Sequence, residues 1–261
     1  MKKIKFSKMV ASGNDFVAVD SLTGVSNIGR FAKTVCDRKY GIGADGLLIV
    51  SPLSAGLVRM RIFNADGSEA EMCGNGARCA ALFSGKKKVI IKTIAGLVDA
   101  QVSGGNVKIK LTQPKFLKLD IPIKINGRPL KVNFVNTGVP HTVVPVEGIG
   151  DVDVFGVGRS IRYHKYFAPA GTNVNFIEVL NSNSIQVRTY ERGVEDETLA
   201  CGTGSVASSL VFASKVKEVK DKVNVHTQGG EVLRVYFKRE GAGFSDVWLE
   251  GKAKLVYKGE Y

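Results

Sequence analysis

The chain has 261 residues, of which 44% are hydrophobic and 23% charged, a balance that excludes disordered and fibrous proteins and allows one large or two small domains. The formal net charge is +13, but apart from Lys86, Lys87 and Lys88 the basic residues are scattered, so we expect no nucleic-acid partner. The four cysteines are too few for a disulfide scaffold and no apolar run is long enough for a membrane span, so we expect a cytoplasmic protein with reduced thiols and no membrane partner.

The first part of the chain alternates short β-rich segments with two helical segments. Hydrophobic periodicity and turn residues predict strands at Lys5–Val10, Phe16–Asp20, Leu47–Val50, Val58–Phe63, Val89–Thr93 and Val98–Val102. They predict helices at Asn27–Cys36 and at Ala77–Phe83, the second opened by Cys73-Gly74-Asn75-Gly76.

The second part of the chain repeats this order of elements. We expect strands at Val132–Asn136, His141–Val146, Val174–Val179, Ile185–Tyr190, Val223–Thr227 and Glu231–Phe237, and a helix at Gly204–Lys215. Strands outnumber helices in both parts and the two types are interleaved, which predicts an α+β protein.

Short motifs recur in register between the two parts and indicate a duplication. Cys73-Gly74-Asn75-Gly76 aligns with Cys201-Gly202-Thr203-Gly204 at an offset of 128 residues. Further matches keep the same order, with Gly13–Val17 on 138–142 at an offset of 125, Gly43–Asp45 on 171–173 at 128, and Arg61–Phe63 on 188–190 at 127. We therefore expect two pseudo-symmetric domains, 1–113 and 114–251, the first completed by a C-terminal strand at 252–261.

Each half places a cysteine directly before Gly-x-Gly and a helix of small residues. A helix N-terminus presents unpaired N–H groups and the positive end of the dipole, which stabilise a thiolate or a bound carboxylate. The spacing excludes three other sites at these turns: Cys73 to Arg78 is one residue too short for a tyrosine-phosphatase loop, a third glycine for dinucleotide binding is missing, and Cys73 and Cys79 lack zinc spacing. We interpret Cys36 and Cys79 as core residues.

Two cysteines at equivalent points of a duplicated fold suggest one site that uses both. Pseudo-twofold symmetry would bring Cys73 and Cys201 face to face. Inverting a carbon centre requires a base on one side and an acid on the other, and a thiolate with a thiol performs both tasks without a metal or prosthetic group. N–H groups at the two helix ends would hold the α-carboxylate and stabilise its enolate.

Long motifs across nearly the whole chain resemble the diaminopimelate epimerase family. They are Gly13–Phe16, Asp37–Gly46, MRIFNADGSEAEMCGNGARC at 60–79, Asn173–Phe176, Tyr190–Gly193 and Glu197–Gly204. The resemblance implies interconversion of LL- and meso-diaminopimelate without pyridoxal phosphate or any other cofactor, in lysine and peptidoglycan-precursor synthesis. It also implies two similar domains, each with strands curled around a central helix, an active site between them, and closure on the substrate.

The resemblance also implies roles for individual residues. Cys73 and Cys201 match the acid/base pair, and His141 and Glu191 match residues that tune the thiols. The expected substrate-binding residues are Asn14, Asn64, Gly74, Asn75, Asn173, Glu191, Arg192, Gly202 and Thr203. Arginine pairs naturally with a distal carboxylate, and asparagine reads both ammonium and carboxylate groups. Val139 stands where the family often has asparagine, so one expected contact to the distal end is missing.

Other interpretations of the same residues stay open. The chain could be a proline or hydroxyproline racemase of the same superfamily, although Arg192 and the asparagines favour a substrate with a second charged end. It could also be a basic binding module with two buried cysteines. In isolation, Glu191-Arg192 would be a surface ion pair and the asparagines turn caps. We expect a small-molecule substrate, and the sequence leaves open whether the chain forms a homodimer.

Overall fold

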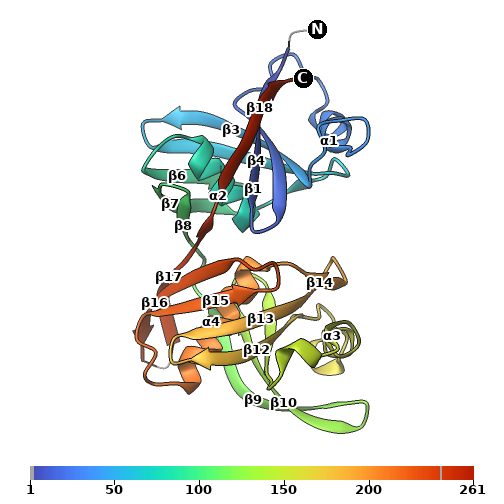
Figure 1. Ribbon diagram of the computed structural model, residues 1–261, viewed down its shortest axis with the longest axis vertical. Coiled ribbons are helices and arrows are strands. Elements are labelled where there is room, and N and C mark those ends of the chain that lie inside the picture. Colours follow the sequence, from blue (N-terminus) through green and yellow to red (C-terminus); the bar gives the residue numbers. More distant parts are fainter. Residues whose placement is uncertain (1–2, 242) are drawn as a thin grey trace. The chain divides into compact units, whose positions relative to one another are not determined.

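The computed structural model describes residues 3–241 and 243–261 (Figure 1). The chain divides into two units, Met1–Lys110 with Glu250–Tyr261, and Leu111–Leu249. The first division, after residue 110, lies three residues before the expected boundary at 113, and the second, after residue 249, lies two residues before the expected boundary at 251. Among the described residues, no helix has both the length and the apolar character that a membrane crossing requires. Each unit is an α+β structure with its own core.

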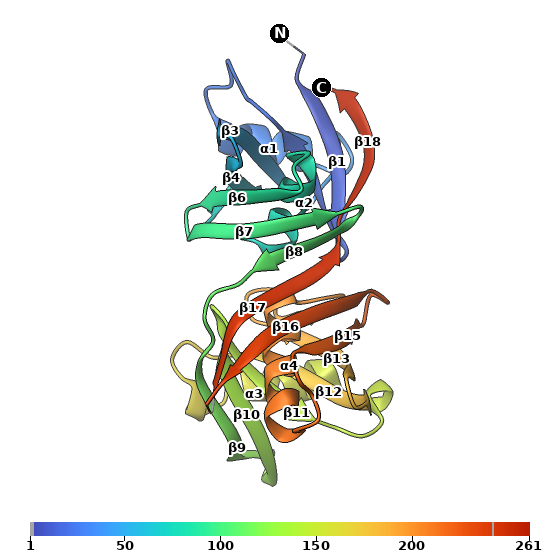
Figure 2. The ribbon, with the colours of Figure 1, turned by 90° about the vertical axis from the view of Figure 1, so that its left-hand side faces the viewer.

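The first unit wraps strands around the helix α2. Its elements are β1 (Lys5–Ala11), β2 (Asn14–Val19), α1 (Ile28–Cys36), β3 (Gly46–Ser54), β4 (Leu57–Asn64), β5 (Glu69–Ala70), α2 (Gly74–Phe83), β6 (Lys88–Thr93), β7 (Gly96–Ser103), β8 (Asn106–Lys110) and β18 (Lys254–Glu260). The strands β6, β7 and β8 form an antiparallel meander (Figure 2), and β1 pairs with both β2 and the C-terminal β18. Helix α2 contacts β1, β2, β3, β6, β7 and β8, so it lies in the middle of the unit.

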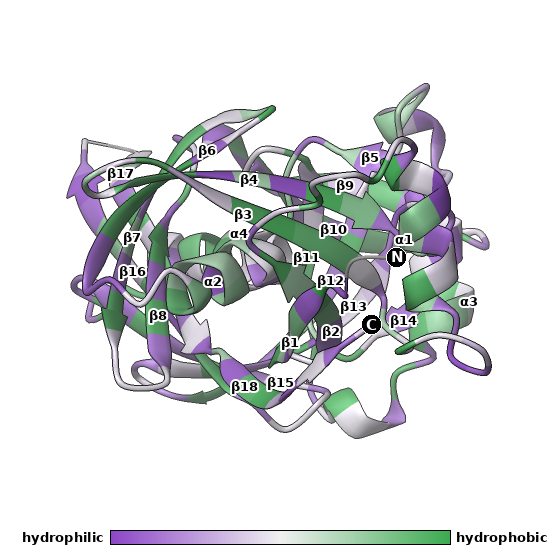
Figure 3. Ribbon diagram, turned by 90° about the horizontal axis from the view of Figure 1, so that it is seen from above, coloured by the Kyte–Doolittle hydropathy of each residue, from purple (hydrophilic) through white to green (hydrophobic). Residues whose placement is uncertain are grey.

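Helix α1 packs one apolar face against strands of the first unit. It begins after Asn27, whose Oδ1 accepts a hydrogen bond from the Arg30 N–H at 2.9 Å. Ala32, Val35 and Cys36 are buried, whereas polar side chains face outward, and Figure 3 shows both hydrophilic and hydrophobic residues on the helix. The buried face joins a core with residues of β2, β3 and β4.

The second unit repeats this plan around helix α4. Its elements are β9 (Lys115–Ile125), β10 (Arg128–Asn136), β11 (Pro140–Pro145), η1 (Ile149–Asp151), α3 (Val154–Arg162), η2 (Lys165–Phe167), β12 (Asn173–Asn181), β13 (Ser184–Glu191), β14 (Asp196–Thr198), α4 (Gly202–Lys215), β15 (Lys222–Thr227) and β16 (Val232–Glu240). Strand β17 (Gly243–Lys252) begins in this unit and ends in the first. Residues 204–213 of α4 are all buried. The side chains of this helix are small or apolar on every face, as is typical of a helix in the middle of a core.

The expected strands and helices are all present with shifted ends, but the sequence did not predict the helix α3, the strands β5, β8, β9, β14 and β17, or the short helices η1 and η2. Helix α3 contains Gly156 and Gly158, which lower its intrinsic helix propensity. Tertiary packing compensates, since a side chain at Gly158 would lie 2.6 Å from Cβ of Tyr190. Figure 1 shows α3 beside β12 and β13, which it contacts.

The strand register corrects the predicted alignment of the two halves by one residue. β3 and β12 begin at Gly46 and Asn173, 127 residues apart rather than 128. Phe16 pairs with the first residue of β3 as His141 pairs with the first residue of β12. Two further pairs correspond, Leu48 with Ile62 in the first unit and Asn175 with Thr189 in the second. We name Phe16, Leu48 and Ile62 the apolar trio, and His141, Asn175 and Thr189 the polar trio.

An ion pair recurs at the same place in both units and supports this register. Arg61 of β4 pairs with Glu69 of β5 through two hydrogen bonds of 2.7 and 2.8 Å. Arg188 of β13 pairs with Glu197 of β14 through two of 2.7 Å. Each pair joins the strand before the cysteine turn to the short strand that leads into it, so both turns have the same anchor.

Candidate active site

Cys73 and Cys201 each occupy the N-cap of the central helix of their unit. Both residues have extended backbone, and the helices begin at Gly74 and Gly202. The backbone carbonyls of the cysteines accept the first helical bonds at 2.8 Å in both turns. The N–H groups of the first helical residues have no partner within the helix, and those of Gly76, Thr203 and Gly204 donate to the cysteine sulfurs. This end of each helix therefore suits an anion.

The Cys73 turn is held by side-chain amides. Cys73 Sγ accepts a hydrogen bond from the Gly76 N–H at 3.4 Å. Asn75 donates to Asn14 Oδ1 at 2.5 Å and accepts at its own Oδ1 from the fully buried Arg78 at 2.7 Å. The structure thus brings together three residues that the sequence predicts for the site, and Arg78, which sequence analysis did not assign, orients the Asn75 amide.

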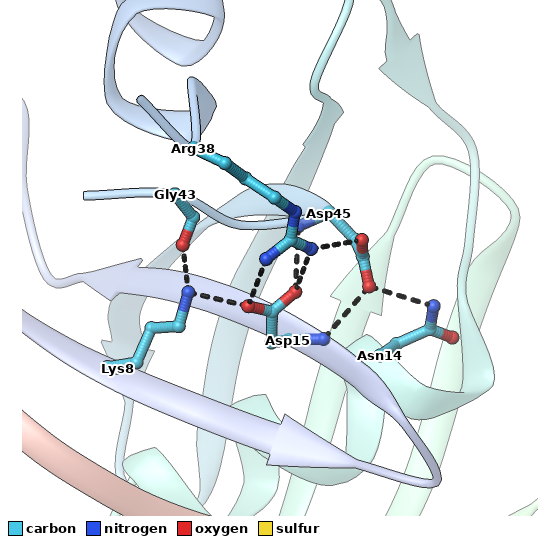
Figure 4. A network of polar contacts seen from close by, with 6 residues as sticks. All are labelled: Lys8, Asn14, Asp15, Arg38, Gly43 and Asp45. Carbon is cyan, nitrogen blue, oxygen red and sulfur yellow. Dashed lines mark hydrogen bonds and ion pairs between the residues drawn. The ribbon is translucent and has the colours of Figure 1, made fainter. Parts of the chain in front are cut away.

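A network of charges holds Asn14 from its other side (Figure 4). Asn14 Nδ2 donates to Asp45 at 3.2 Å, Arg38 bridges Asp45 and Asp15, and the buried Lys8 ammonium lies 2.7 Å from Asp15. Burial by itself would raise the pKa of Asp15, but the hydrogen bonds from Arg38 and Lys8 outweigh it and lower that pKa below its usual range. The network therefore ties the β2 end that carries Asn14 to the loop before β3.

Asn64 lies at the end of β4, where it closes the turn into β5. Its backbone N–H donates to the Ser68 carbonyl at 2.8 Å, and its Nδ2 donates to Ser68 Oγ at 2.9 Å. These contacts fit the turn-capping interpretation, and its role as a substrate contact remains a prediction.

The Cys201 turn is held by hydroxyl groups instead of amides. Thr203 Oγ1 lies 3.5 Å from Cys201 Sγ, and the Thr203 carbonyl accepts a hydrogen bond from Thr137 at 3.0 Å. Burial raises the pKa of the Cys201 thiol to about 12, and the charge of Glu191 adds to this, while the Thr203 hydroxyl and nearby N–H groups oppose it. Cys201 is therefore a neutral thiol in the substrate-free protein.

His141 lies behind this turn and is completely buried. Its Nε2 is 2.9 Å from Thr203 Oγ1, and its Nδ1 is 3.1 Å from Asn175 Nδ2. Burial, and then the charge of Arg192, lowers the pKa of His141 to about 3. The imidazole is therefore neutral at physiological pH and supplies hydrogen bonds rather than a positive charge.

Glu191 does not pair with its neighbour Arg192. The carboxylate accepts a hydrogen bond from Thr198 Oγ1 at 3.1 Å, and burial raises its pKa although that hydrogen bond acts in the opposite direction. Glu191 is therefore a half-buried carboxyl whose charge acts on Cys201 rather than half of a surface ion pair, and its role in the site stays a prediction.

Arg192 lines a cavity of about 610 Å³ within the second unit. Its Nη1 donates to the Ala170 carbonyl at 3.1 Å, and no carboxylate of residues 3–241 or 243–261 pairs with it. The backbone N–H of Arg192 donates to Asn173 Oδ1 at 2.9 Å, and Asn173 Nδ2 donates to the Pro140 carbonyl at 3.0 Å. Asn173 therefore fixes the strand end that carries Arg192.

Asn136 lines the same cavity and was not predicted from the sequence. The Gly138 N–H donates to its Oδ1 at 2.9 Å, and the amide nitrogen of Asn136 offers two N–H donors that suit a carboxylate. It lies three residues before Val139, where the sequence lacks the expected asparagine. Only the pairing of β10 with β11, which puts Asn136 opposite Pro140, identifies it.

Cys36 and Cys79 are buried, as expected for core residues. Burial raises their pKa to about 11 and about 12, respectively. Cys79 lies inside α2 and Cys36 is the last residue of α1, so neither residue is an N-cap.

Comparison with known proteins identifies the family. The sequence profile described as Diaminopimelate epimerase matches residues 6–117 and 133–256. The chain is similar to "Diaminopimelate epimerase" of Aquifex aeolicus, with 42% identity covering 98% of this chain and 97% of the relative, and to that of Methanocella arvoryzae, with 44% identity covering 100% and 97%.

Solved structures share the fold at low sequence identity. A Bacillus anthracis phenazine biosynthesis protein of the PhzF family has a TM-score of 0.71 at 19% identity, covering 100% of this chain and 99% of that one. A hydroxyproline epimerase from Agrobacterium vitis has a TM-score of 0.68 at 15% identity, covering 100% and 91%. These two likenesses concern the fold, whereas the profile and the full-length relatives show that the chain belongs to the diaminopimelate epimerase family of isomerases.

Proposed function

We propose that the chain interconverts LL- and meso-diaminopimelate with Cys73 and Cys201 as the acid/base pair, in lysine and peptidoglycan-precursor synthesis. The observation that carries this proposal is that both cysteines are N-caps of the two central helices. At an N-cap, each thiol lies beside backbone N–H groups that have no partner within the helix and can stabilise negative charge.

In the proposed step, one thiolate removes the α-hydrogen and becomes a thiol, and the electron pair of the C–H bond moves into the carboxylate to form an enolate. The other thiol gives its proton to the opposite face and becomes a thiolate, so that the reaction balances. In the direction in which Cys201 is the acid, its raised pKa keeps it protonated until the enolate forms, and in the reverse direction the two cysteines exchange roles. The N–H groups of Gly74, Asn75, Gly202 and Thr203 suit the enolate charge.

We further propose that Arg192 and Asn136 bind the distal carboxylate of the substrate. Both line one cavity, and together they offer a guanidinium and an amide with two N–H donors. A distal charged group is what separates diaminopimelate from proline and hydroxyproline, which lack a second carboxylate.

The test is exchange of the α-hydrogen in deuterated water with purified protein. We expect deuterium uptake and isomer interconversion with LL- and meso-diaminopimelate, and neither with proline or hydroxyproline. Cys36→Ala serves as the control for a cysteine that the mechanism does not use. Exchange of proline but not diaminopimelate, or no exchange with any of these amino acids, would refute the proposed function.

A further inference from the structure

The polar trio connects to the Cys201 sulfur through an ordered series of hydrogen bonds. Asn175 is fully buried, and each of its polar atoms has a partner. Its Nδ2 donates to the Thr142 carbonyl at 3.0 Å, and its Oδ1 accepts from Thr189 Oγ1 at 3.0 Å. Because a carbonyl oxygen only accepts, the amide nitrogen of Asn175 must lie on the side of Thr142 and His141.

This orientation decides which nitrogen of His141 carries the proton. The second N–H of Asn175 points to His141 Nδ1 at 3.1 Å, so Nδ1 must accept and has no hydrogen. The neutral ring therefore carries its hydrogen on Nε2, which donates to Thr203 Oγ1 at 2.9 Å. Because Thr203 Oγ1 accepts from His141, its own hydrogen points elsewhere, and the hydroxyl can donate it to Cys201 Sγ at 3.5 Å.

We propose that Asn175 is a positioning residue that acts on Cys201 through His141 and Thr203, by fixing the histidine tautomer that makes the threonine hydroxyl a donor to the sulfur. This inference rests on the proposed function, in which Cys201 gives up its proton during turnover. A hydroxyl that donates to sulfur stabilises the thiolate and has little effect on the thiol. The chain of hydrogen bonds therefore makes a buried thiol a better acid.

The charged surroundings do not supply this stabilisation. Glu191 acts on Cys201 with a negative charge, which disfavours the thiolate, and Arg192 acts on His141, which disfavours the imidazolium. Among the described residues, these are the charged groups that influence the two side chains. What favours the thiolate at this turn is therefore neutral, namely the Thr203 hydroxyl with the series of hydrogen bonds behind it, and the backbone N–H groups of Thr203 and Gly204.

The experiment measures ionisation of Cys201 without any substrate, so its failure is distinguishable from failure of the proposed epimerase activity. Methyl methanethiosulfonate reacts with thiolates, and peptide mapping by mass spectrometry gives the rate at Cys201 alone. Asn175→Leu retains the size of the side chain and removes the donor to His141. We expect Cys201 to react roughly tenfold more slowly at pH 8.5, equivalent to about one pH unit in its titration.

Asn133→Leu is the matched control. Asn133 is also a buried asparagine of the second unit, with hydrogen bonds to the backbone of Val143 and Asp120 and none to His141. Loosening of the unit by either substitution would expose Cys201 and accelerate its labelling, which is the opposite of the expected effect. Slower labelling in Asn175→Leu but not in Asn133→Leu supports the proposal, and equal or faster labelling in Asn175→Leu overturns it.

Thr203→Val provides a second route if Asn175→Leu does not fold. It removes the last hydroxyl and should slow labelling to a similar extent. The double variant should show no further decrease, since both changes break one series of hydrogen bonds. Nitrogen-15 spectra of the chain's three histidines should show His141 as the neutral Nε2–H tautomer, and an Nδ1–H tautomer or an imidazolium would contradict the proposal.

Discussion

The two cysteine turns have the same backbone and the same ion-pair anchor, but different side chains pack beneath them. Under the Cys73 turn, the apolar side chains of Leu48 and Ile62 lie 3.2 Å from the position that a Cβ on Gly76 would take. Under the Cys201 turn, Asn175 Oδ1 lies 2.2 Å from the corresponding position on Gly204. The two units therefore share the helix N-termini but differ in the side chains beneath them, which are apolar in the first unit and hydrogen-bonded in the second.

The charged side chains near the predicted site residues differ between the two units. The first unit surrounds Asn14 with the ionised network of Lys8, Asp15, Arg38 and Asp45, and at the corresponding place in the second unit stands the neutral loop around Pro140. The second unit instead carries Arg192 and Glu191, whose counterparts in the first are Ala65 and Asn64. Two scaffolds with the same strand order and the same cysteine turn therefore carry different charged side chains around that turn.

The strongest test of this comparison removes each thiol in turn. We expect Cys73→Ala and Cys201→Ala to lose epimerisation by at least about a thousandfold, because each side of the carbon loses its only acid/base group. Each variant should still exchange the α-hydrogen of one isomer with retention, LL-diaminopimelate for one variant and meso for the other. Mass spectrometry of deuterium uptake measures this, and full epimerisation by either variant would rule out two thiols.

Arg192→Ala tests whether the second unit binds the distal end. Losing a charge-assisted contact in a desolvated site should weaken binding by roughly 2–5 kcal/mol with the fold intact by circular dichroism. The exposed Arg128→Ala, in the same unit, is the control for loss of a positive charge. Unchanged steady-state kinetics in Arg192→Ala would remove Arg192 from the site.

Asp15→Asn tests whether the first unit depends on its charged network. The substitution leaves the buried Lys8 ammonium without its ion partner, which should cost about 3 kcal/mol of unfolding free energy at neutral pH. Hydrogen exchange should accelerate in β1, β2 and the loop before β3. The exposed Asp99→Asn should have little effect, and similar urea midpoints for both variants would show that the network contributes no stability.

The pH dependence of stability should reveal the neutral network of the second unit. Because the pKa of His141 is about 3 in the folded protein and near 6.5 when unfolded, the unfolded chain binds a proton that the folded chain does not, and stability falls as the pH drops below 6.5. Relative to His141→Gln, wild type should lose up to about 2 kcal/mol between pH 7 and pH 5.

The raised pKa of Glu191 has the opposite sign, since it destabilises the folded protein when the pH rises above the ordinary value of a glutamate. That contribution is common to both proteins, so the difference between their urea denaturation curves isolates His141. Parallel curves for the two proteins from pH 7 to pH 5 would mean that His141 is already protonated in the fold.

The smallest effect compares two alanine substitutions at equivalent glycines. Gly204→Ala should cost about 2 kcal/mol, because its Cβ meets an Asn175 side chain that three hydrogen bonds hold in place. Gly76→Ala should cost about 1 kcal/mol or less, since Ile62 and Leu48 need to move only slightly and alanine favours the helix. Thermal unfolding measures the difference, and an equal cost would mean that Asn175 moves freely.

The sequence alone determined the α+β class, the duplication, the two helix-capping cysteines and the family resemblance. These properties depend on local patterns, namely the two-residue period of strands, small residues in the central helices, and a cysteine before Gly-x-Gly. The sequence predicts these properties because each depends on residues that are close together along the chain. The resemblance supplied the expected site residues in the same way, since each lies inside a contiguous motif.

Only the tertiary structure decided what supports each turn. Asn175 was aligned one residue away from its true counterpart, because a shift of one residue in a strand changes no local propensity but reverses the face of every side chain. Asn136, Arg78 and Thr189 gave no signal either, since a lone polar residue in a strand or helix is usually exposed. Their partners lie 2 to 66 residues away, and the distant ones come close only in the folded chain.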